Sequence, residues 1–156
     1  RRVLFRSHHG ADPQVYRNNL KLAADWAKDL GVSILIEPIN KTDMPGYFLS
    51  SCKDAQSVIE DLGVCNLGLQ FDFYHCFRVE NSVLEAMHMY YSLIRHYQCA
   101  HPLDRSEPTQ ELIDYQLVFR TLDERGFEGW VGCEYKPKNE TLSGLDWFST
   151  WKEDHL

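Results

Sequence analysis

The chain has 156 residues, of which 44% are apolar and 13% aromatic, and its formal net charge is -7 at pH 7. This length and apolar content suffice for one domain with a buried core and exclude a disordered chain. The acidic balance and the lack of any lysine and arginine cluster argue against a nucleic-acid partner. No apolar run approaches the ~18 residues that a membrane span needs, so we expect no membrane segment.

The five cysteines are odd in number and include no CxxC pair. Most of them fall within apolar segments, which is typical of reduced, buried thiols in an intracellular protein, and we expect a cytoplasmic location. They are Cys52, Cys65, Cys76, Cys99 and Cys133.

The first seven residues, R-R-V-L-F-R-S, resemble the conceptual translation of a sequencing adapter. We therefore expect residues 1–7 to be a non-native leader, and residues 8–156 to belong to a longer reading frame that begins near His8. The alternative is a genuine basic leader, although it lacks the apolar core and cleavage site of a signal peptide.

Helix and strand patterns alternate along the rest of the chain. Asp12 and Pro13 predict the start of a helix that ends at Gly31, because aspartate is a good N-cap and proline fits the first helical position. A short strand of branched apolar residues, 33–36, follows at once. A second helix, capped by Ser50 or Ser51, then leads through Gly63 to a strand at 67–71.

The second half of the chain repeats this order. It predicts a helix over about 80–94, a strand at 97–100, a polar loop at 101–114, a helix at 115–125 and a strand at 130–133. A final amphipathic helix begins near Thr141, with Leu145, Trp147, Phe148 and Trp151 on its apolar side. Four helix-strand units with long connections predict a parallel sheet with helices packed outside it.

Three of the four predicted strands end in an acid, namely Glu37, Asp72 and Glu134, and the remaining one contains Gln98. Successive parallel strands would project these side chains from one face of the sheet, where ligands bind in such folds. Like charges gathered in this way raise each other's pKa unless a cation lies among them. Carboxylate and amide oxygens suit a hard divalent ion, so we expect Mg²⁺ or Mn²⁺.

Four segments, in this order and spacing, resemble the hydroxypyruvate isomerase family of the xylose isomerase-like TIM barrels. They are I-E-P-I-N around Glu37, L-Q-F-D-F-Y-H around Asp72 and His75, H-Y-Q-C-A around Gln98, and W-V-G-C-E-Y-K-P around Glu134. The resemblance runs from about Val15 to Trp147. Since a complete (β/α)₈ barrel needs ~250 residues, it implies the C-terminal half of such a barrel, with four parallel strands and outer helices.

The resemblance implies metal ligands at Glu37, Asp72, Gln98 and Glu134. It also implies that Glu37 and Glu134 form an acid/base pair, and that His75 and Arg105 contact substrate oxygens. The implied reaction interconverts hydroxypyruvate and tartronate semialdehyde: one carboxylate removes a proton beside a carbonyl, and a proton returns one carbon along through an enediolate.

The loop after Gln98 departs from the family pattern. The usual form is near Q-I-A-D-x-P-G-R-H-E-P-G-T-G-E-I-N-Y, whereas this chain has Q-C-A-H-P-L-D-R-S-E-P-T-Q-E-L-I-D-Y. Arg105 keeps its place, but the paired glycines are gone. The family's later glutamate falls either on Leu112 or, with a one-residue shift, on Glu111. Substrate choice is the property that such loop changes affect most.

Two alternatives stay open from the sequence. One is a ketose 3-epimerase or another sugar isomerase of the same superfamily, which would share the ligands and differ in the loops. The other is a truncated or degenerate relative without catalysis. We expect the 156-residue chain by itself to be inactive and poorly soluble, because a half barrel leaves sheet edges open. Two copies could pair as a homo-oligomer to close them.

Overall fold

The structure is a computed structural model that describes residues 2–7, 10–80 and 82–148. Its centre is a parallel sheet whose spatial order, β1-β2-β3-β4-β5, follows the order along the chain. The strands are β1 (Arg2–Leu4), β2 (Ser33–Ile36), β3 (Leu67–Asp72), β4 (Ile94–Cys99) and β5 (Val131–Cys133). Because each crossover moves one strand along in the same direction, the sheet curls into half of a TIM barrel, as the sequence predicted.

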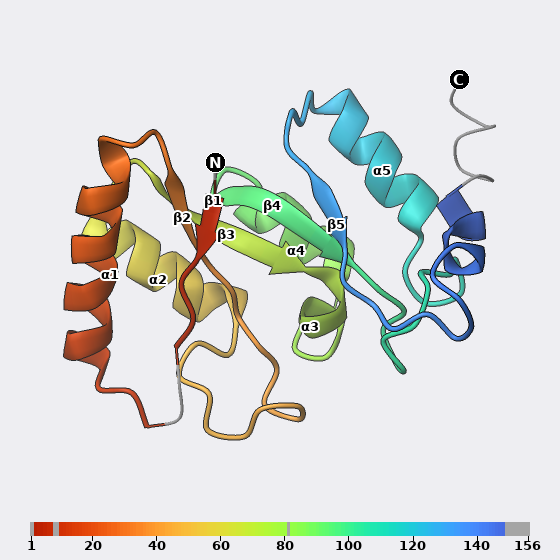
Figure 1. The fold of residues 1–156 in the computed structure, drawn as a ribbon, viewed down its shortest axis with the longest axis horizontal. Helices are drawn as coiled ribbons and strands as arrows, with labels where there is room; N and C mark the ends of the chain where they lie inside the picture. Colours follow the sequence, from red (N-terminus) through yellow and green to blue (C-terminus); the bar gives the residue numbers. More distant parts are fainter. Residues whose placement is uncertain (1, 8–9, 81, 149–156) are drawn as a thin grey trace.

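The helices that join the strands pack outside the curled sheet. They are α1 (Pro13–Lys28), α2 (Cys52–Leu62), the short α3 (Phe73–Phe77), α4 (Val83–Tyr90) and α5 (Tyr115–Glu124). In Figure 1, α1 and α2 lie together on one side, while α5 and the last described residues lie at the opposite end. α1 packs against β2, and α2 packs against β3. These two strands are thereby fixed from behind, and their carboxyl ends are left to carry functional side chains.

The predicted caps at Asp12, Ser51 and Gly63 are confirmed, whereas α1 ends at Lys28 with Asp29 as its C-cap, before the predicted end at Gly31. The Asp12 side chain accepts hydrogen bonds from the backbone N–H groups of Gln14 (2.8 Å) and Val15 (2.9 Å). Ser51, one of the two serines considered, caps α2 by accepting from the N–H of Asp54 at 3.1 Å. Gly63 ends α2 in the left-handed region, with a φ of 58°. Caps at these positions satisfy backbone groups that the helix itself leaves unpaired.

The predicted helix over 80–94 is wrong at both ends. Ser82 caps α4, so the helix begins only at Val83, and it ends at Tyr90. Ile94 lies in β4 rather than in the helix, and it faces the core together with Tyr97 and Cys99. An apolar residue at this spacing fits either the helical or the strand period. The short helix α3, which carries His75, was not predicted at all.

One strand more is present than the four expected. Residues Arg2–Leu4 pair with β2 in parallel register, with Val3 opposite Ile34. Backbone hydrogen bonds of this kind do not depend on the side chains, so the non-native origin of residues 1–7 stays a prediction.

Three cysteines are buried as expected, whereas Cys65 and Cys133 are exposed; all five are free thiols. At the C-terminal end, residues 143–145 form a 3₁₀ turn that continues into a helical turn. Trp147 there stacks on Phe119 with ring centroids 6.2 Å apart, so its predicted packing role is confirmed. Trp151 lies outside the described residues. Within the described part of the chain, no helix combines the length and the apolar character needed to cross a membrane.

Candidate active site

The four predicted ligand residues meet at one rim of the sheet. Glu37 directly follows β2, Asp72 is the last residue of β3, and Glu134 directly follows β5. Gln98 lies in β4, in register with Asp72 on one side. Parallel strands place their carboxyl ends at one edge, so four side chains that are up to 97 positions apart by number come together there. The rim therefore gathers three acids and one amide.

Glu37 is a buried carboxylate without a hydrogen-bond partner. Its residue is 1% exposed, and neither carboxylate oxygen accepts a hydrogen bond. Burial, and after it the charge of Glu134, raise its pKa to about 7, against opposing effects of Arg6 and the Gln70 amide. Arg6, 3.7 Å away, belongs to the predicted leader; without it the pKa would rise further. An unpartnered buried carboxylate must be protonated or must face a cation.

Asp72 is buried in the same place and joins the rim to α3. Its Oδ1 accepts a hydrogen bond from the backbone N–H of Tyr74 at 2.9 Å, which makes it the N-cap of that helix. Burial, followed by the charge of Glu37, raises its pKa to about 8. The two acids thus hold each other toward the neutral form in this structure.

Arg105 brings a positive charge to the rim between Asp72 and Glu134, at the site where the family resemblance implied it. Its Nη2 donates to Glu134 Oε2 at 2.7 Å and lies 3.4 Å from Asp72 Oδ2. The guanidinium also stacks over the Tyr74 ring, 4.8 Å from the centroid. The backbone of Arg105 has a φ of 56°, which is strained for a residue with a Cβ. Hydrogen bonds to His101 O and from the Lys136 N–H fix this conformation.

Gln70 is a site residue that the sequence analysis missed. It is 6% exposed, and its Nε2 donates to Gln98 Oε1 at 2.6 Å. Gln98 in turn donates from Nε2 to Glu134 Oε2 at 3.0 Å. The available signal was spacing, because Gln70 lies two residues before Asp72 in β3 and so points to the same face. A chain of amides thereby ties β3 to the acid that follows β5.

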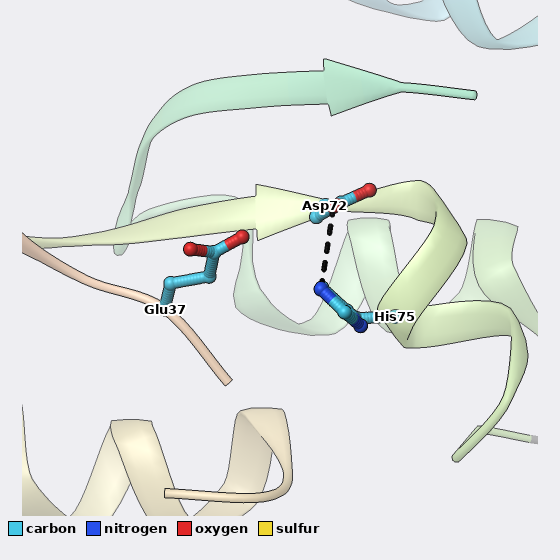
Figure 2. A group of neighbouring side chains, drawn as sticks. All are labelled: Glu37, Asp72 and His75. Atoms are coloured by element: carbon cyan, nitrogen blue, oxygen red, sulfur yellow. Dashed lines mark ion pairs between the residues drawn. The ribbon is translucent and has the colours of Figure 1, made fainter. Parts of the chain in front are cut away.

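His75 projects from α3 toward the rim (Figure 2). It is 4% exposed, and its Nε2 lies 3.7 Å from Asp72 Oδ2. Burial, and after it the charge of Arg105, lower its pKa to about 4, so the ring is neutral at pH 7. On the far side of the ring, Asn40 Nδ2 lies 2.8 Å from Nδ1. Asn40 is 1% exposed and was also missed, although it ends the I-E-P-I-N segment.

The residues present fit a divalent cation. Ligand atoms of Glu37, Asp72 and His75 all lie within 4.8 Å of one another (Figure 2). The oxygens of Glu37, which accept no hydrogen bond, and the raised pKa values of both acids suit the ligands of an oxygen-coordinated cation. Two ligand sets are compatible with the rim: this cluster of three, and the predicted set in which Gln98 and Glu134 replace His75.

The polar loop at 101–114 carries Arg105 into the site and leaves other candidates outside it. Glu111 and Leu112, the two positions weighed for the family's later glutamate, are both exposed. Glu107 instead fixes the loop to the C-terminal segment, because its Oε1 accepts from the Lys138 N–H at 2.9 Å.

Comparison with known protein families matches residues 4–151 to a family model described as xylose isomerase-like TIM barrel. One curated relative is the 2-oxo-tetronate isomerase of Cupriavidus necator, which is 42% identical over 87% of this chain and 52% of its own length. Another is the hydroxypyruvate isomerase of Escherichia coli K12, which is 38% identical over 86% of this chain and 52% of its own length. The chain thus spans about half the length of the curated relatives it matches.

Solved structures agree with this match. The crystal structure titled AP endonuclease, family 2 from Brucella melitensis superposes with a TM-score of 0.90 at 31% identity, covering 96% of this chain and 60% of that one. More distant sugar epimerases share the fold at lower identity, for example a D-psicose 3-epimerase from Clostridium cellulolyticum at 18% and a TM-score of 0.69.

Proposed function

This chain belongs to the xylose isomerase-like TIM barrel family, and from that premise we propose that it carries the acid/base site of an isomerase for small hydroxy-keto acids. The observation that carries the proposal is the pairing of Glu37 and Glu134 on the rim, with Asp72 and Gln98 between them in the strand order. Carboxylates after β2 and β5 would then flank a small substrate bound at this rim.

The proposed reaction moves a carbonyl between neighbouring carbons. One glutamate removes the proton from the carbon beside the carbonyl and leaves an enediolate. The hydroxyl proton of that carbon passes to the former carbonyl oxygen, and a proton is then returned to the former carbonyl carbon. Burial raises the pKa of Glu37 to about 7 in the metal-free protein, which increases its basicity in the direction that a general base needs at neutral pH. Glu37 is buried, whereas the side chain of Glu134 is 40% exposed.

A divalent cation, Mg²⁺ or Mn²⁺, would be held by Glu37, Asp72, Gln98 and Glu134. When bound, it would polarise the substrate carbonyl and offset the negative charge of the enediolate. Its charge would also lower the pKa values of the two buried acids, which keeps Glu37 able to accept a proton.

Arg105 and His75 are proposed to orient the substrate. Arg105 is the cation of the described rim that already pairs with two carboxylates, and its planar guanidinium suits the carboxylate of a 2-oxo acid. His75 is neutral and faces the same space, so it can donate a hydrogen bond to a substrate oxygen.

Hydroxypyruvate, giving tartronate semialdehyde, is the proposed substrate. The name of the Cupriavidus relative points to a larger acid, 2-oxo-tetronate, as a second candidate of the same chemistry. A sugar epimerase is less well supported, since the epimerase structures are under 25% identical and bear on the fold alone. A nuclease, which the name of the Brucella protein suggests, is less well supported, because that protein is 31% identical to this chain, whereas the two isomerase relatives are 42% and 38% identical.

The test is an isomerase assay of the complete gene product with hydroxypyruvate, 2-oxo-tetronate and a ketohexose. We expect turnover of a 2-oxo acid in the presence of Mn²⁺, and a loss of about 10²-fold or more in kcat for Glu37→Gln and for Glu134→Gln. Glu124→Gln, an exposed acid of α5, is the matched control and should leave kcat unchanged. Activity on the ketohexose alone would reject the proposed substrate, and no activity on any of the three would support a non-catalytic relative.

A further inference from the structure

The strand-end loop after β2 and the helix α3 hold the side chains of Asn40, Asp43 and His75 in one hydrogen-bonded group. Asn40 lies three residues after Glu37, and His75 three residues after Asp72, so the group is built from the segments that follow two neighbouring strands. Asn40 and His75 are 1% and 4% exposed. At such burial, each donor in the group needs an acceptor.

The orientation of the Asn40 amide follows from its partners. Asn40 Oδ1 accepts from the backbone N–H of Asp43 at 2.9 Å, and that N–H can only donate. Asn40 Nδ2 lies 3.1 Å from a carboxylate oxygen of Asp43, which accepts when ionised. Turning the amide by 180° would set two donors against each other and two acceptors against each other. The Nδ2 group therefore faces His75.

The hydrogen-bond partners of the His75 ring also fix its tautomer. Nδ1 of the ring lies 2.8 Å from Asn40 Nδ2, so it must accept this hydrogen bond with its lone pair. Asp43 Oδ2 is 4.0 Å from the same nitrogen, too far to accept a proton from it in a hydrogen bond. A neutral imidazole with a lone pair on Nδ1 carries its proton on Nε2.

We propose that Asn40, oriented by the backbone of Asp43, is a positioning residue that fixes His75 as the Nε2–H tautomer, so that the ring presents a hydrogen-bond donor to the substrate. This deepens the proposed function and rests on it for the identity of the acceptor. Nε2 faces the rim beside Asp72 (Figure 2), but at 3.7 Å from Asp72 Oδ2 it is beyond hydrogen-bonding distance, so its N–H is not donated to that carboxylate.

The same tautomer decides between the two ligand sets for the cation. A metal ligand needs a lone pair on the nitrogen that faces the ion, and here that nitrogen carries the proton. His75 is therefore a donor beside the cation site and not one of its ligands, which leaves Gln98 and Glu134 to complete the set with Glu37 and Asp72.

The test is the protonation of the His75 ring nitrogens, read from long-range ¹H–¹⁵N correlation spectra of the metal-free complete gene product at pH 7, without substrate. His75→Gln identifies the resonances by their loss. We expect the wild type to show a bare Nδ1 and a protonated Nε2. Asn40→Asp replaces the donor with an acceptor of the same shape, so the proton should move to Nδ1.

Asp43→Ala is the matched control, because it removes the carboxylate but keeps the backbone N–H that orients Asn40; its ring should stay Nε2–H. Asn40→Ala serves if the aspartate variant does not fold, and should show both tautomers. A protonated Nδ1 in the wild type, an unchanged ring in both Asn40 variants, or a switched ring in Asp43→Ala would overturn the proposal.

Kinetics separate this proposal from the proposed function. If the protein is an isomerase, Asn40→Asp should lower kcat/KM by about tenfold or more, with Mn²⁺ affinity within about threefold of the wild type. The spectra need no turnover. If the protein shows the predicted tautomers but no activity, only the proposed function is wrong. If the protein is an active isomerase but the His75 tautomer is unchanged in the Asn40 variants, only this inference is wrong.

Discussion

Asp72 and Glu37 are buried acids whose neighbours include other acids, so their protonation affects how stable the metal-free protein is. In the folded protein their pKa values are about 8 and about 7, above the ordinary values of 3.8 and 4.5. At pH values between the ordinary and the raised pKa of each acid, the folded state binds more protons than the unfolded state. The stability that the two groups contribute is therefore fully present below about pH 4 and is lost as the pH rises to about 8.

Since ionisation of Asp72 lowers the stability of the metal-free protein, Asp72→Asn should stabilise it at high pH. At pH 8 and with a chelator present, the variant should have a free energy of unfolding about 1–3 kcal/mol higher than the wild type, because it removes a buried charge. Below pH 4, where the wild-type acid is protonated, the gain should vanish. Denaturant unfolding at both pH values measures it.

The exposed acid Asp123 of α5 supplies the control, since Asp123→Asn should change neither value. Adding Mn²⁺ should stabilise the wild type at pH 8 and leave Asp72→Asn nearly unaffected, because the variant lacks a ligand. A variant that is less stable than the wild type at pH 8 without metal would contradict the interpretation of the rim as strained by its own charge.

Residue by residue, the sequence located the acids of the site better than it located their partners. Glu37, Asp72 and Glu134 could be predicted because each ends a strand where a charge is unusual. Gln70 and Asn40 could not, because a buried amide leaves no pattern in the sequence until the two groups it joins are known. Their importance comes from contacts that cross 28 and 35 positions.

At the scale of elements, the units that carry the site are set by their caps. Asp12 begins α1, which packs behind β2 and so supports the strand that ends at Glu37. Asp72 begins α3 and is at the same time part of the rim. A helix that starts on a site residue places His75 one turn away from it, which is how two residues three positions apart come to face the same space.

Asp12→Ala should lower the free energy of unfolding by about 1 kcal/mol, since it leaves two backbone N–H groups of α1 without their acceptor. Asp12→Asn keeps an acceptor in the same place and should stay within a few tenths of a kcal/mol of the wild type. Chemical denaturation of the two variants checks the difference. Equal losses in both would show that charge, and not the capping hydrogen bonds, is what Asp12 contributes.

Element boundaries show where sequence reasoning failed. The apolar period continued from α4 into β4 without a break, so Ile94 was assigned to the wrong element. Ser82, which caps α4, is the residue that could have corrected the start of the helix. The short helix α3 could not be foreseen, because a helix of five residues carries too little periodicity to detect.

At the scale of the whole molecule, five parallel strands curl into half of a barrel, with the site along one rim and an open strand at each end of the sheet. The alternation of helices and strands was enough to predict this architecture. It could not predict that residues 2–4 would add a strand to β2, because side-chain patterns carry little information about an edge that pairs through its backbone.

The central claim is that carboxylates of this rim move a proton through an enediolate. The direct test is to run the isomerisation of hydroxypyruvate by the complete gene product in D₂O and to examine the tartronate semialdehyde by ¹H NMR. Proton transfer through Glu37 and Glu134 predicts deuterium on the carbon that was the carbonyl of hydroxypyruvate. Incorporation of deuterium at this carbon should be slower in Glu37→Gln and in Glu134→Gln. Turnover at the wild-type rate with no deuterium at that carbon would show that the same hydrogen moves between the carbons, by a direct shift or on a single shielded base, and would contradict transfer through two glutamates.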